Sequence, residues 1–266
     1  MPALTATLIS YNEEQDLPHA LASLAGIADE IIVVDSGSTD RTCEIARTFG
    51  ARVYTRALTN FAEQKNYATS LSSNDWILSI DCDHELSPEL CSMLLAWKQQ
   101  TPQNDGYELL LLTNYLGGWI RHSGWYPEYK LILFRRDKGK FVSALHERFH
   151  LEGAEGRRNN RLNGHLFHYT IRTIAEHRAK VETMSTLAAE DLFARGRRSW
   201  RGAMIFASSW TILQRLVFQH GVLDGRRGWL IAWFSGKYIY LKFRKLGRLL
   251  AGEQLHHRSW PGPGEA

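Results

Sequence analysis

The chain has 266 residues, of which 44% are hydrophobic and 11% aromatic, so it can bury a full core. Its length predicts one main domain with an appendage. Its cysteines, Cys43, Cys82 and Cys91, are odd in number and lack Cys-x-x-Cys spacing, so they indicate neither a disulfide framework nor a four-ligand zinc site. The formal net charge of +4 is small. Because residues 1–5 lack the basic and apolar stretches of a secretory signal, we expect the chain to stay in the cytoplasm.

The small net charge conceals an uneven distribution. Residues 172–266 hold 16 Lys and Arg against 7 Asp and Glu, a net charge of +9. Residues 1–171 hold 16 against 21, a net charge of −5. An acidic first part can hold a metal ion, whereas a basic tail rich in tryptophan suits a phosphate-bearing surface, such as an anionic membrane or nucleic acid.

The first hundred residues alternate short apolar runs with segments of helical pattern, which is typical of βαβ units and a largely parallel sheet. In chain order the pattern predicts a strand at 4–9, a helix at 13–24, a strand at 30–34, a helix from about 38 to 49, a strand at 52–55, a helix at 61–71, a strand at 76–80 and a helix from about 87 to 99. Ser87 and Pro88 start the last helix, since serine caps helices and proline suits the first helical position.

The remainder of the chain is less regular and then becomes helical. Residues 107–112 and 130–135 predict strands of a partly antiparallel second half, and the helical pattern begins at Arg172. We therefore expect an α/β domain at 1–171 that divides at about residue 100, a helical extension at 172–260 and a disordered tail at 261–266. The longest charge-free stretches of the extension, 202–214 and 228–236, are well short of the roughly 20 residues that cross a bilayer.

Three of the predicted strands run into acidic or polar clusters. The clusters are Tyr11-Asn12-Glu13-Glu14, Asp35-Ser36-Gly37-Ser38-Thr39-Asp40 and Asp81-Cys82-Asp83-His84-Glu85. Ligands of open α/β sheets bind beyond the carboxyl ends of the strands, which favours a polar binding site here. Each cluster alone also fits a helix cap, because Asp, Ser and Asn are preferred there.

Asp81 and Asp83 form an Asp-x-Asp pair directly after a predicted buried strand. Two carboxylates in one loop repel each other unless a divalent cation bridges them to phosphate oxygens. Such a cation stabilises the diphosphate that departs when a sugar–phosphate bond breaks. The pair therefore predicts a Mg²⁺ or Mn²⁺ site.

The three clusters, in this order at the ends of successive strands, resemble the nucleotide-binding half of glycosyltransferase family 2. The resemblance implies a GT-A fold, which is a Rossmann-like mixed sheet flanked by helices, with donor nucleotide bound in the first half and acceptor in the second. It implies that Asp35 contacts the base, that Asp81 lies near the ribose and donor sugar, and that Asp83 binds the metal. The implied donor-binding residues are Tyr11, Asn12, Glu13, Glu14, Asp35, Ser36, Lys65 and Asp81.

The resemblance extends to a branch that includes lipopolysaccharide inner-core β-1,4-glucosyltransferases. Its marks are Phe61-Ala62-Glu63-Gln64-Lys65-Asn66, Leu145-His146-Glu147, Gly164-His165 with His168-Tyr169, and Gly221-Val222-Leu223-Asp224-Gly225. The branch usually reads Asp-Ala-Asp-Glu where this chain has Asp81-Cys82-Asp83-His84, which leaves the role of Glu85 open.

Three further residues have two interpretations each. Glu147 is the candidate general base, since inverting enzymes of the family place a carboxylate in the second half, and it is otherwise a structural or metal-binding carboxylate. His146 can approach the metal or orient Glu147, although histidines beside carboxylates are commonly simple hydrogen-bond partners. Lys65 points at the pyrophosphate or is a solvated lysine on a helix face.

The implied reaction is a single displacement with inversion at the anomeric carbon. Glu147 takes the acceptor proton, and the cation held by Asp83 stabilises the departing diphosphate. The resemblance favours a UDP-sugar, first UDP-glucose, as donor and the lipopolysaccharide inner core as acceptor. A polyisoprenyl phosphate or a polysaccharide is the alternative acceptor. A nucleotidyltransferase is disfavoured because the first strand is not followed by a glycine-rich, basic loop.

The extension predicts contact with the inner face of the cytoplasmic membrane. Tryptophans such as Trp210, Trp229 and Trp233 alternate with basic residues, as in helices that lie at a bilayer surface. An amphipathic helix packed on the catalytic domain has the same pattern. A nucleic-acid-binding protein would also explain a basic aromatic tail, but the acidic strand ends would repel a polyanion, so we expect no nucleic acid partner.

Overall fold

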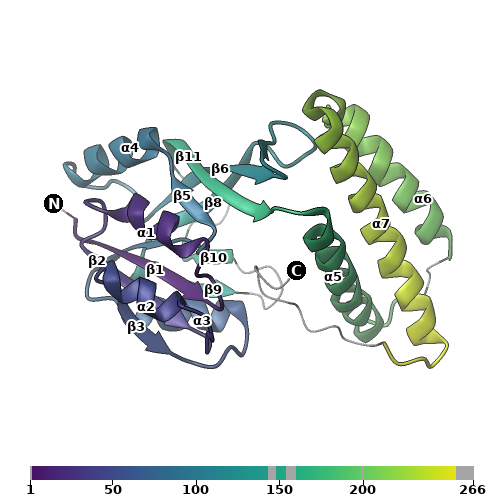
Figure 1. The fold of residues 1–266 in the computed structure, drawn as a ribbon, viewed down its shortest axis with the longest axis horizontal. Coiled ribbons are helices and arrows are strands. Elements are labelled where there is room, and N and C mark those ends of the chain that lie inside the picture. Colours follow the sequence, from purple (N-terminus) through teal and green to yellow (C-terminus); the bar gives the residue numbers. More distant parts are fainter. Residues whose placement is uncertain (1, 143–147, 154–159, 199–200, 256–266) are drawn as a thin grey trace. The chain divides into compact units, whose positions relative to one another are not determined.

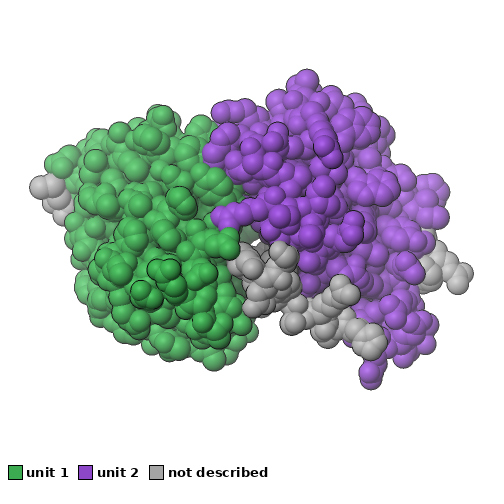
Figure 2. Space-filling view, in the orientation of Figure 1, with its two compact units in different colours: residues 1–112, 128–169 green, residues 113–127, 170–266 purple. Residues whose placement is uncertain are grey.

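The computed structural model describes residues 2–142, 148–153, 160–198 and 201–255. The chain divides into two compact units, shown in Figure 2. Unit 1 comprises residues 1–112 and 128–169, and unit 2 comprises residues 113–127 and 170–266. Unit 2 contains the predicted helical extension. It also contains the segment 113–127, which the sequence pattern assigns to the first domain.

A mixed sheet forms the centre of unit 1 (Figure 1). Its strands are β1 (Leu4–Ser10), β2 (Glu30–Asp35), β3 (Arg52–Thr55), β4 (Trp76–Ser79), β5 (His84–Leu86), β6 (Gly106–Tyr115), β8 (Glu128–Arg135) and β11 (Asn160–Ile171), and β7 (Gly118–Trp119) pairs with β6. The order is β3-β2-β1-β4-β8-β6-β11-β5, and the last residues of β6 and β11 belong to unit 2. Strands β1 to β4 pair in parallel, whereas β8 is antiparallel to β4 and β6.

Helices cover both faces of this sheet. They are α1 (Leu17–Leu24), α2 (Thr42–Thr48), α3 (Phe61–Ser70) and α4 (Pro88–Lys98), and a hairpin of β9 (Gly139–Val142) and β10 (Arg148–Leu151) follows the short 3₁₀ helix η1 (Arg136–Lys138). Alternate side chains of each strand point to opposite faces. One set, including Leu8, packs with α1, α2 and α4. The other set, including Ile32 and Ile77, packs with α3 and the β9–β10 hairpin.

One predicted helix begins later than expected. Helix α1 starts at Leu17 rather than Glu13, whereas α2 starts at Thr42, close after the predicted cap at Ser38–Asp40. The residues before α1 form a turn in which the Glu13 carbonyl oxygen accepts from the N–H groups of Asp16 and Leu17 at 3.2 and 3.0 Å. The predicted start at Glu13 was wrong because the Glu13 N–H donates to Thr42 Oγ1 at 2.7 Å, which ties this turn to the start of α2.

Unit 2 is largely helical. Its elements are α5 (Ile174–Ala194), α6 (Arg201–Leu213), the π-helical turn η2 (Gln214–Phe218), the 3₁₀ turn η3 (Gly221–Asp224) and α7 (Gly225–Leu250). Helix α7 lies between α5 and α6 (Figure 1). A Cβ at Gly236 would lie 2.4 Å from Ile212 Cγ1, so this glycine permits the close approach of α6 and α7. Among the described residues, no helix is both long enough and apolar enough to cross a bilayer.

The α5–α7 contact contains a buried lysine. The Lys245 ammonium lies 2.8 Å from a Glu182 carboxylate oxygen and donates to Ser185 Oγ and Thr186 Oγ1 at 2.9 and 2.8 Å. A buried charge is tolerated when it is paired and hydrogen-bonded in this way. The architecture confirms the predicted α/β fold with a mixed, helix-flanked sheet and a helical extension.

Candidate active site

The polar clusters gather at the carboxyl edge of β1, β2 and β4. From β1 the chain adds β2 and β3 on one side of β1 and then β4 on its other side, so a topological switch point lies between β1 and β4. Ligands of α/β sheets bind at such a point. The loop that follows β4 contacts the end of β1, since the Cys82 thiol lies 3.2 Å from the carbonyl oxygen of Ile9. The sequence-predicted site therefore lies where the topology favours one.

The loops after β1 and β2 are joined by side-chain hydrogen bonds. Asn12 has a positive φ of 54°, which asparagine tolerates better than most residues. Its Oδ1 accepts from the Thr39 N–H at 2.8 Å, and its own N–H donates to Ser38 Oγ at 2.8 Å. The Glu14 N–H donates to Asp40 Oδ2 at 3.1 Å. These bonds fix the loop that carries the exposed Tyr11 ring.

Asp35 is only 1% exposed, and its carboxylate organises this loop. Its Oδ2 accepts from the N–H groups of Gly37 and Ser38 at 2.9 and 2.8 Å, and its Oδ1 accepts from the hydroxyls of Ser10 and Ser38. Burial alone would raise the pKa of Asp35, but these bonds lower it below its usual range. Ser36, beside it, lies 3.3 Å from Gln64 Nε2.

Lys65 and Asp81 form an ion pair, with Nζ 2.8 Å from Oδ1. Lys65 is buried, so it is not the solvated lysine that the sequence left as an alternative. Its ammonium also lies 5.7 Å from the centre of the Phe141 ring. Burial would raise the pKa of Asp81, but Lys65 and then His84 hold it well below the usual range. Asp81 is therefore a carboxylate that Lys65 keeps in place.

The neighbouring Asn66 joins α3 to β9. Its Nδ2 donates to the Phe141 carbonyl oxygen at 2.9 Å, and its Oδ1 accepts from the Phe141 N–H at 2.8 Å. One amide side chain thus satisfies both backbone groups of one strand residue. This pair of bonds holds Phe141 beside the Lys65–Asp81 ion pair.

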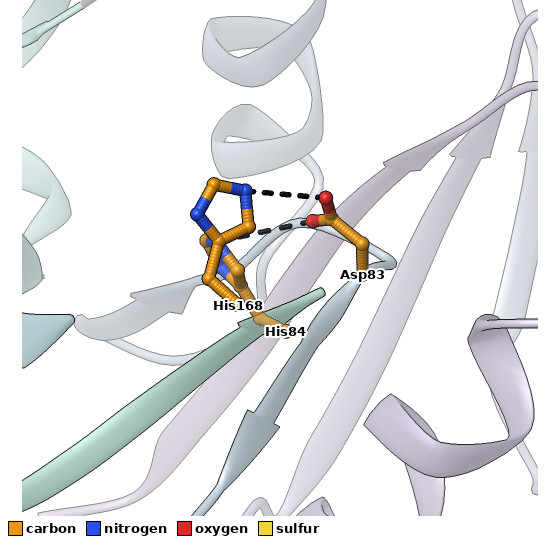
Figure 3. Close-up of side chains that lie close together, drawn as sticks. All are labelled: Asp83, His84 and His168. Carbon is orange, nitrogen blue, oxygen red and sulfur yellow. Dashed lines mark ion pairs between the residues drawn. The ribbon is translucent and has the colours of Figure 1, made fainter. Parts of the chain in front are cut away.

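Asp83, His84 and His168 form a cluster (Figure 3). Their potential ligand atoms all lie within 4.8 Å of one another. His168 Nε2 is 3.2 Å from Asp83 Oδ2, and His84 Nε2 is 3.9 Å from Asp83 Oδ1. Burial would raise the pKa of Asp83, but His168 and His84 lower it. Asp83 is therefore ionised and has an imidazole beside it.

Strand β11 brings His168 to Asp83. It pairs antiparallel with β5 and aligns His168 with His84, and the Tyr169 N–H donates to the Asp83 carbonyl oxygen at 2.9 Å. The sequence marked His168 only as part of a family resemblance, and its place beside Asp83 was not predicted. A signal was present, because Leu166 and His168 are two residues apart and so face the same side of a strand.

His84 has a different role from His168. Its Nδ1 accepts a hydrogen bond from the Asp81 N–H at 3.1 Å, so its single proton is on Nε2 when the ring is neutral. Burial, despite the nearby carboxylates, lowers the pKa of His84 to about 4, so the neutral form prevails. An Nε2 that carries a proton cannot ligate a metal. His84 therefore fits as a residue that orients the loop 81–83 rather than as a ligand.

A cavity of about 610 Å³ opens beside the Lys65–Asp81 pair. Its lining includes Lys65, Asp81, His84, Glu108, Tyr129, Lys130 and Arg148.

Glu85, whose role the sequence left open, accepts a hydrogen bond from the Tyr169 hydroxyl at 2.9 Å. The predicted base Glu147 and its neighbour His146 lie outside the described residues, directly before Arg148 in the chain.

Comparison with known families decides the class of this site. The model of "Glycosyl transferase family 2" matches residues 5–148, which include Asp35, Asp81 and Asp83. The chain belongs to glycosyltransferase family 2. The resemblance stated from the sequence is thereby confirmed, and the chain is a glycosyltransferase. His168 lies beyond the matched residues, and its place beside Asp83 comes from the structure.

Two similar glycosyltransferases span nearly the whole chain. One, the "Lipopolysaccharide core biosynthesis glycosyltransferase LpsC" of Rhizobium meliloti, is 30% identical over 91% of this chain and 91% of its own. An uncharacterized glycosyltransferase of Rickettsia typhi is 28% identical over 94% of this chain and 88% of its own.

Similarity to solved structures is weaker. The crystal structure of Staphylococcus aureus TarS 1–349 has a TM-score of 0.41 and 14% identity over 96% of this chain and 93% of that one. Glucosyl-3-phosphoglycerate synthase of Mycobacterium tuberculosis, in complex with Mg²⁺ and UDP, has a TM-score of 0.37 and 21% identity over 51% of this chain and 57% of that one.

Proposed function

We propose that this family 2 enzyme is an inverting, metal-dependent glycosyltransferase that moves a hexose from a UDP-sugar to a lipopolysaccharide inner-core acceptor. The observation that carries the proposal is the Asp83–His168 pair, two residues along the chain from Asp81. Asp81 and its ion-pair partner Lys65 line a cavity large enough for a saccharide group. UDP-glucose is the first donor to test, because the branch that the sequence resembles includes glucosyltransferases.

Asp83 and His168 fit a divalent cation. Their nearest oxygen and nitrogen are 3.2 Å apart, close to the spacing of about 3 Å between adjacent ligands of an ion with bonds of about 2.1 Å. His168 Nδ1 has no hydrogen-bond partner among the described residues, so it can carry the ring proton and leave Nε2 unprotonated. When bound, Mg²⁺ or Mn²⁺ would neutralise the growing charge of the departing diphosphate.

The other site residues position the donor and move the proton. Asp81, held by Lys65, is proposed to accept hydrogen bonds from the ribose or donor sugar, and the loops around Tyr11, Asn12, Glu13, Glu14, Asp35 and Ser36 to bind the nucleoside. Glu147 is proposed to take the proton from the attacking acceptor hydroxyl. Attack from the face opposite the departing diphosphate inverts the anomeric configuration.

The acceptor is proposed to be lipid-linked, which would place the reaction at the inner face of the cytoplasmic membrane. The full-length similarity to LpsC, whose name refers to lipopolysaccharide core biosynthesis, supports this acceptor over the alternatives of a polyisoprenyl phosphate or a polysaccharide. No nucleic acid partner is expected, because the acidic strand ends would repel it.

The test is a screen of donor hydrolysis over UDP-, GDP- and dTDP-sugars with Mg²⁺ or Mn²⁺, followed by transfer to truncated lipopolysaccharide, polyisoprenyl phosphate and polysaccharide acceptors. Asp83→Ala should abolish metal-dependent turnover. The matched control is Asp75→Ala, which removes a 69% exposed carboxylate of unit 1 and should leave turnover unchanged. Turnover of Asp83→Ala at the wild-type rate with the same metal requirement would refute the metal assignment, and transfer to a different acceptor would replace the proposed one.

A further inference from the structure

The hairpin formed by α6, η2, η3 and α7 exposes an unusual number of large apolar side chains. Phe206 is 78% exposed and Trp233 61%, and Trp210, Phe218, Leu223 and Trp229 are each more than half exposed. These six residues are called the aromatic ridge below. The Trp210 and Phe218 rings are in contact, with centres 5.6 Å apart, and Trp229 and Trp233 are one helical turn apart on α7. Neighbouring exposed apolar groups of this kind mark an interaction surface, whereas single exposed apolar residues are ordinary.

Basic residues share the exposed face of α7 with the tryptophans. Trp229, Trp233 and Tyr240 are spaced by four and seven residues, so they lie on one side of the helix. Arg226 precedes Trp229 by three residues and Arg244 follows Tyr240 by four, which places both on the same side, and both are exposed. Other sides of α7 pack inside unit 2, where Gly236 of α7 contacts α6 and Lys245 of α7 contacts α5.

The hairpin offers almost no negative charge. Residues 201–250 contain nine Lys and Arg and a single acidic residue, Asp224. The Asp224 side chain is only 4% exposed, and its carboxylate accepts hydrogen bonds from the Arg121 N–H and the Ser123 hydroxyl at 3.1 and 2.7 Å. The exposed face of α7 thus combines aromatic rings with uncompensated positive charge.

We infer that the α6–α7 hairpin is a docking surface for an anionic lipid bilayer. The aromatic ridge enters the interface between headgroups and acyl chains, where tryptophan is favoured, and Arg226 and Arg244 contact lipid phosphates. A second copy of the chain fits less well, because two such faces would bring Arg226 and Arg244 close to the same positive charges of the partner. This surface lies in unit 2, and the inference deepens the proposed membrane location by naming the residues that would hold the chain there.

The experiment measures binding of the full chain to vesicles of phosphatidylcholine alone and of phosphatidylcholine mixed with phosphatidylglycerol, by co-sedimentation and by tryptophan fluorescence. Wild type should bind the mixed vesicles more tightly, with a blue shift of emission. Trp229→Ser with Trp233→Ser should weaken binding about tenfold or more. Arg226→Glu with Arg244→Glu should remove the preference for the anionic lipid. Phe193→Ser, at an exposed apolar residue of α5, is the control and should bind as wild type does.

Circular dichroism and donor hydrolysis in the absence of lipid should be the same for all variants, which separates loss of docking from loss of folding or catalysis. Absence of wild-type binding to both vesicles would overturn the inference. So would equal weakening by Phe193→Ser. A concentration-dependent dimer that the Trp229→Ser, Trp233→Ser variant abolishes, in a chain that ignores lipid, would assign the ridge to self-association instead.

Discussion

His84 and His168 lie next to each other, with ring centres 4.8 Å apart, yet their nitrogens have different surroundings. His84 Nδ1 is bonded to the backbone of Asp81, whereas His168 presents Nε2 to Asp83. The residue type alone could not separate these roles. The separation depends on which nitrogen is engaged, and this is known only once the chain is folded.

If His168 is a metal ligand, His168→Ala should raise the Mn²⁺ concentration for half-maximal donor hydrolysis by about 10- to 100-fold. The measurement is the hydrolysis rate over a Mn²⁺ titration. His165→Ala, on the same strand, is the matched control and should titrate like wild type. An unchanged Mn²⁺ dependence in His168→Ala would remove this histidine from the metal site.

Asp35→Asn should lower stability as well as nucleotide affinity. The wild-type carboxylate accepts two backbone N–H bonds and two hydroxyl bonds, and the amide NH₂ of asparagine cannot accept any. Leaving buried donors unpaired costs on the order of 1–3 kcal/mol. Urea unfolding and UDP calorimetry test this. Wild-type stability with weakened UDP binding would instead indicate a carboxylate whose main task is to contact the base.

Glu147→Gln should reduce sugar transfer by about 10² to 10⁴ while UDP-sugar affinity barely changes, because the amide keeps the size of the side chain but cannot take a proton. The measurements are donor affinity by calorimetry and transfer rate at saturating acceptor, at one metal concentration. Equal loss of affinity and rate would indicate a metal ligand or structural carboxylate rather than a base.

At the scale of elements, Gly164 sets the position of β11. It has φ +101°, and a Cβ there would lie 2.5 Å from the Leu90 backbone nitrogen at the start of α4. Next to this contact, a backbone hydrogen bond joins the two segments: the Ser87 N–H, before α4, donates to the His165 carbonyl oxygen of β11 at 2.9 Å. The glycine therefore lets β11 approach α4 and carry His168 to Asp83.

Gly164→Ala should destabilise the protein by on the order of 1–3 kcal/mol and weaken Mn²⁺-dependent hydrolysis, because the methyl group must push β11 away from α4. Thermal unfolding and a Mn²⁺ titration measure the two effects. Gly153→Ala is the control, since Gly153 has a similar positive φ of 72° but no atom of the described residues within 4 Å of its Cβ position. Equal loss of stability in both variants would attribute the effect to φ alone.

The sequence predicted the regular elements far better than the irregular ones. Strand β3 was predicted at its observed bounds, and β1, β2, β4 and α4 within a residue or two, because apolar runs and capping residues delimit them. Strand β11 was not predicted, since asparagines, histidines and a glycine interrupt its apolar alternation. Strand β5 has only three residues and depends on β11 for its partner. Of the proposed metal pair, the sequence therefore predicted Asp83 but not His168, which β11 brings beside it.

At the scale of the whole molecule, the change of charge along the chain nearly coincides with a boundary between units. The sequence becomes basic from Arg172, and unit 2 resumes at Thr170. Charge could not assign the segment 113–127 to a unit, because its sequence contains a single charged residue, Arg121. Its place in unit 2 depends on contacts distant in sequence, such as Ser123 with Asp224.

A buried histidine of unit 2 should make stability depend on pH. His177 Nδ1 lies 2.8 Å from the Tyr115 hydroxyl, and burial, with a smaller effect of Lys180, lowers the pKa of His177 to about 4 from 6.5. Between these values the unfolded chain binds the proton and the folded chain does not. This stability is therefore complete above pH 6.5 and is lost as pH falls towards 4, by at most about 1.4 kcal/mol per pH unit.

Urea unfolding at pH 7 and at about pH 5 measures this slope, at values above the usual pKa of carboxylates. His177→Gln should reduce this slope but not abolish it, because the buried His84 also has a pKa lowered to about 4. His150→Gln, at an exposed histidine, should leave the slope unchanged. The same slope in His177→Gln as in wild type would assign the acid sensitivity to other groups.

The two hydrogen bonds between Asn66 and Phe141 also bear on solubility. Strand β9 pairs with β10 on one side, and the N–H and C=O of Phe141 face away from that partner. Unpaired backbone groups at a sheet edge are a template on which another chain can add a strand. The Asn66 amide occupies both groups and so closes this part of the edge. A single side chain of α3 therefore blocks strand addition at Phe141, next to the Lys65–Asp81 ion pair.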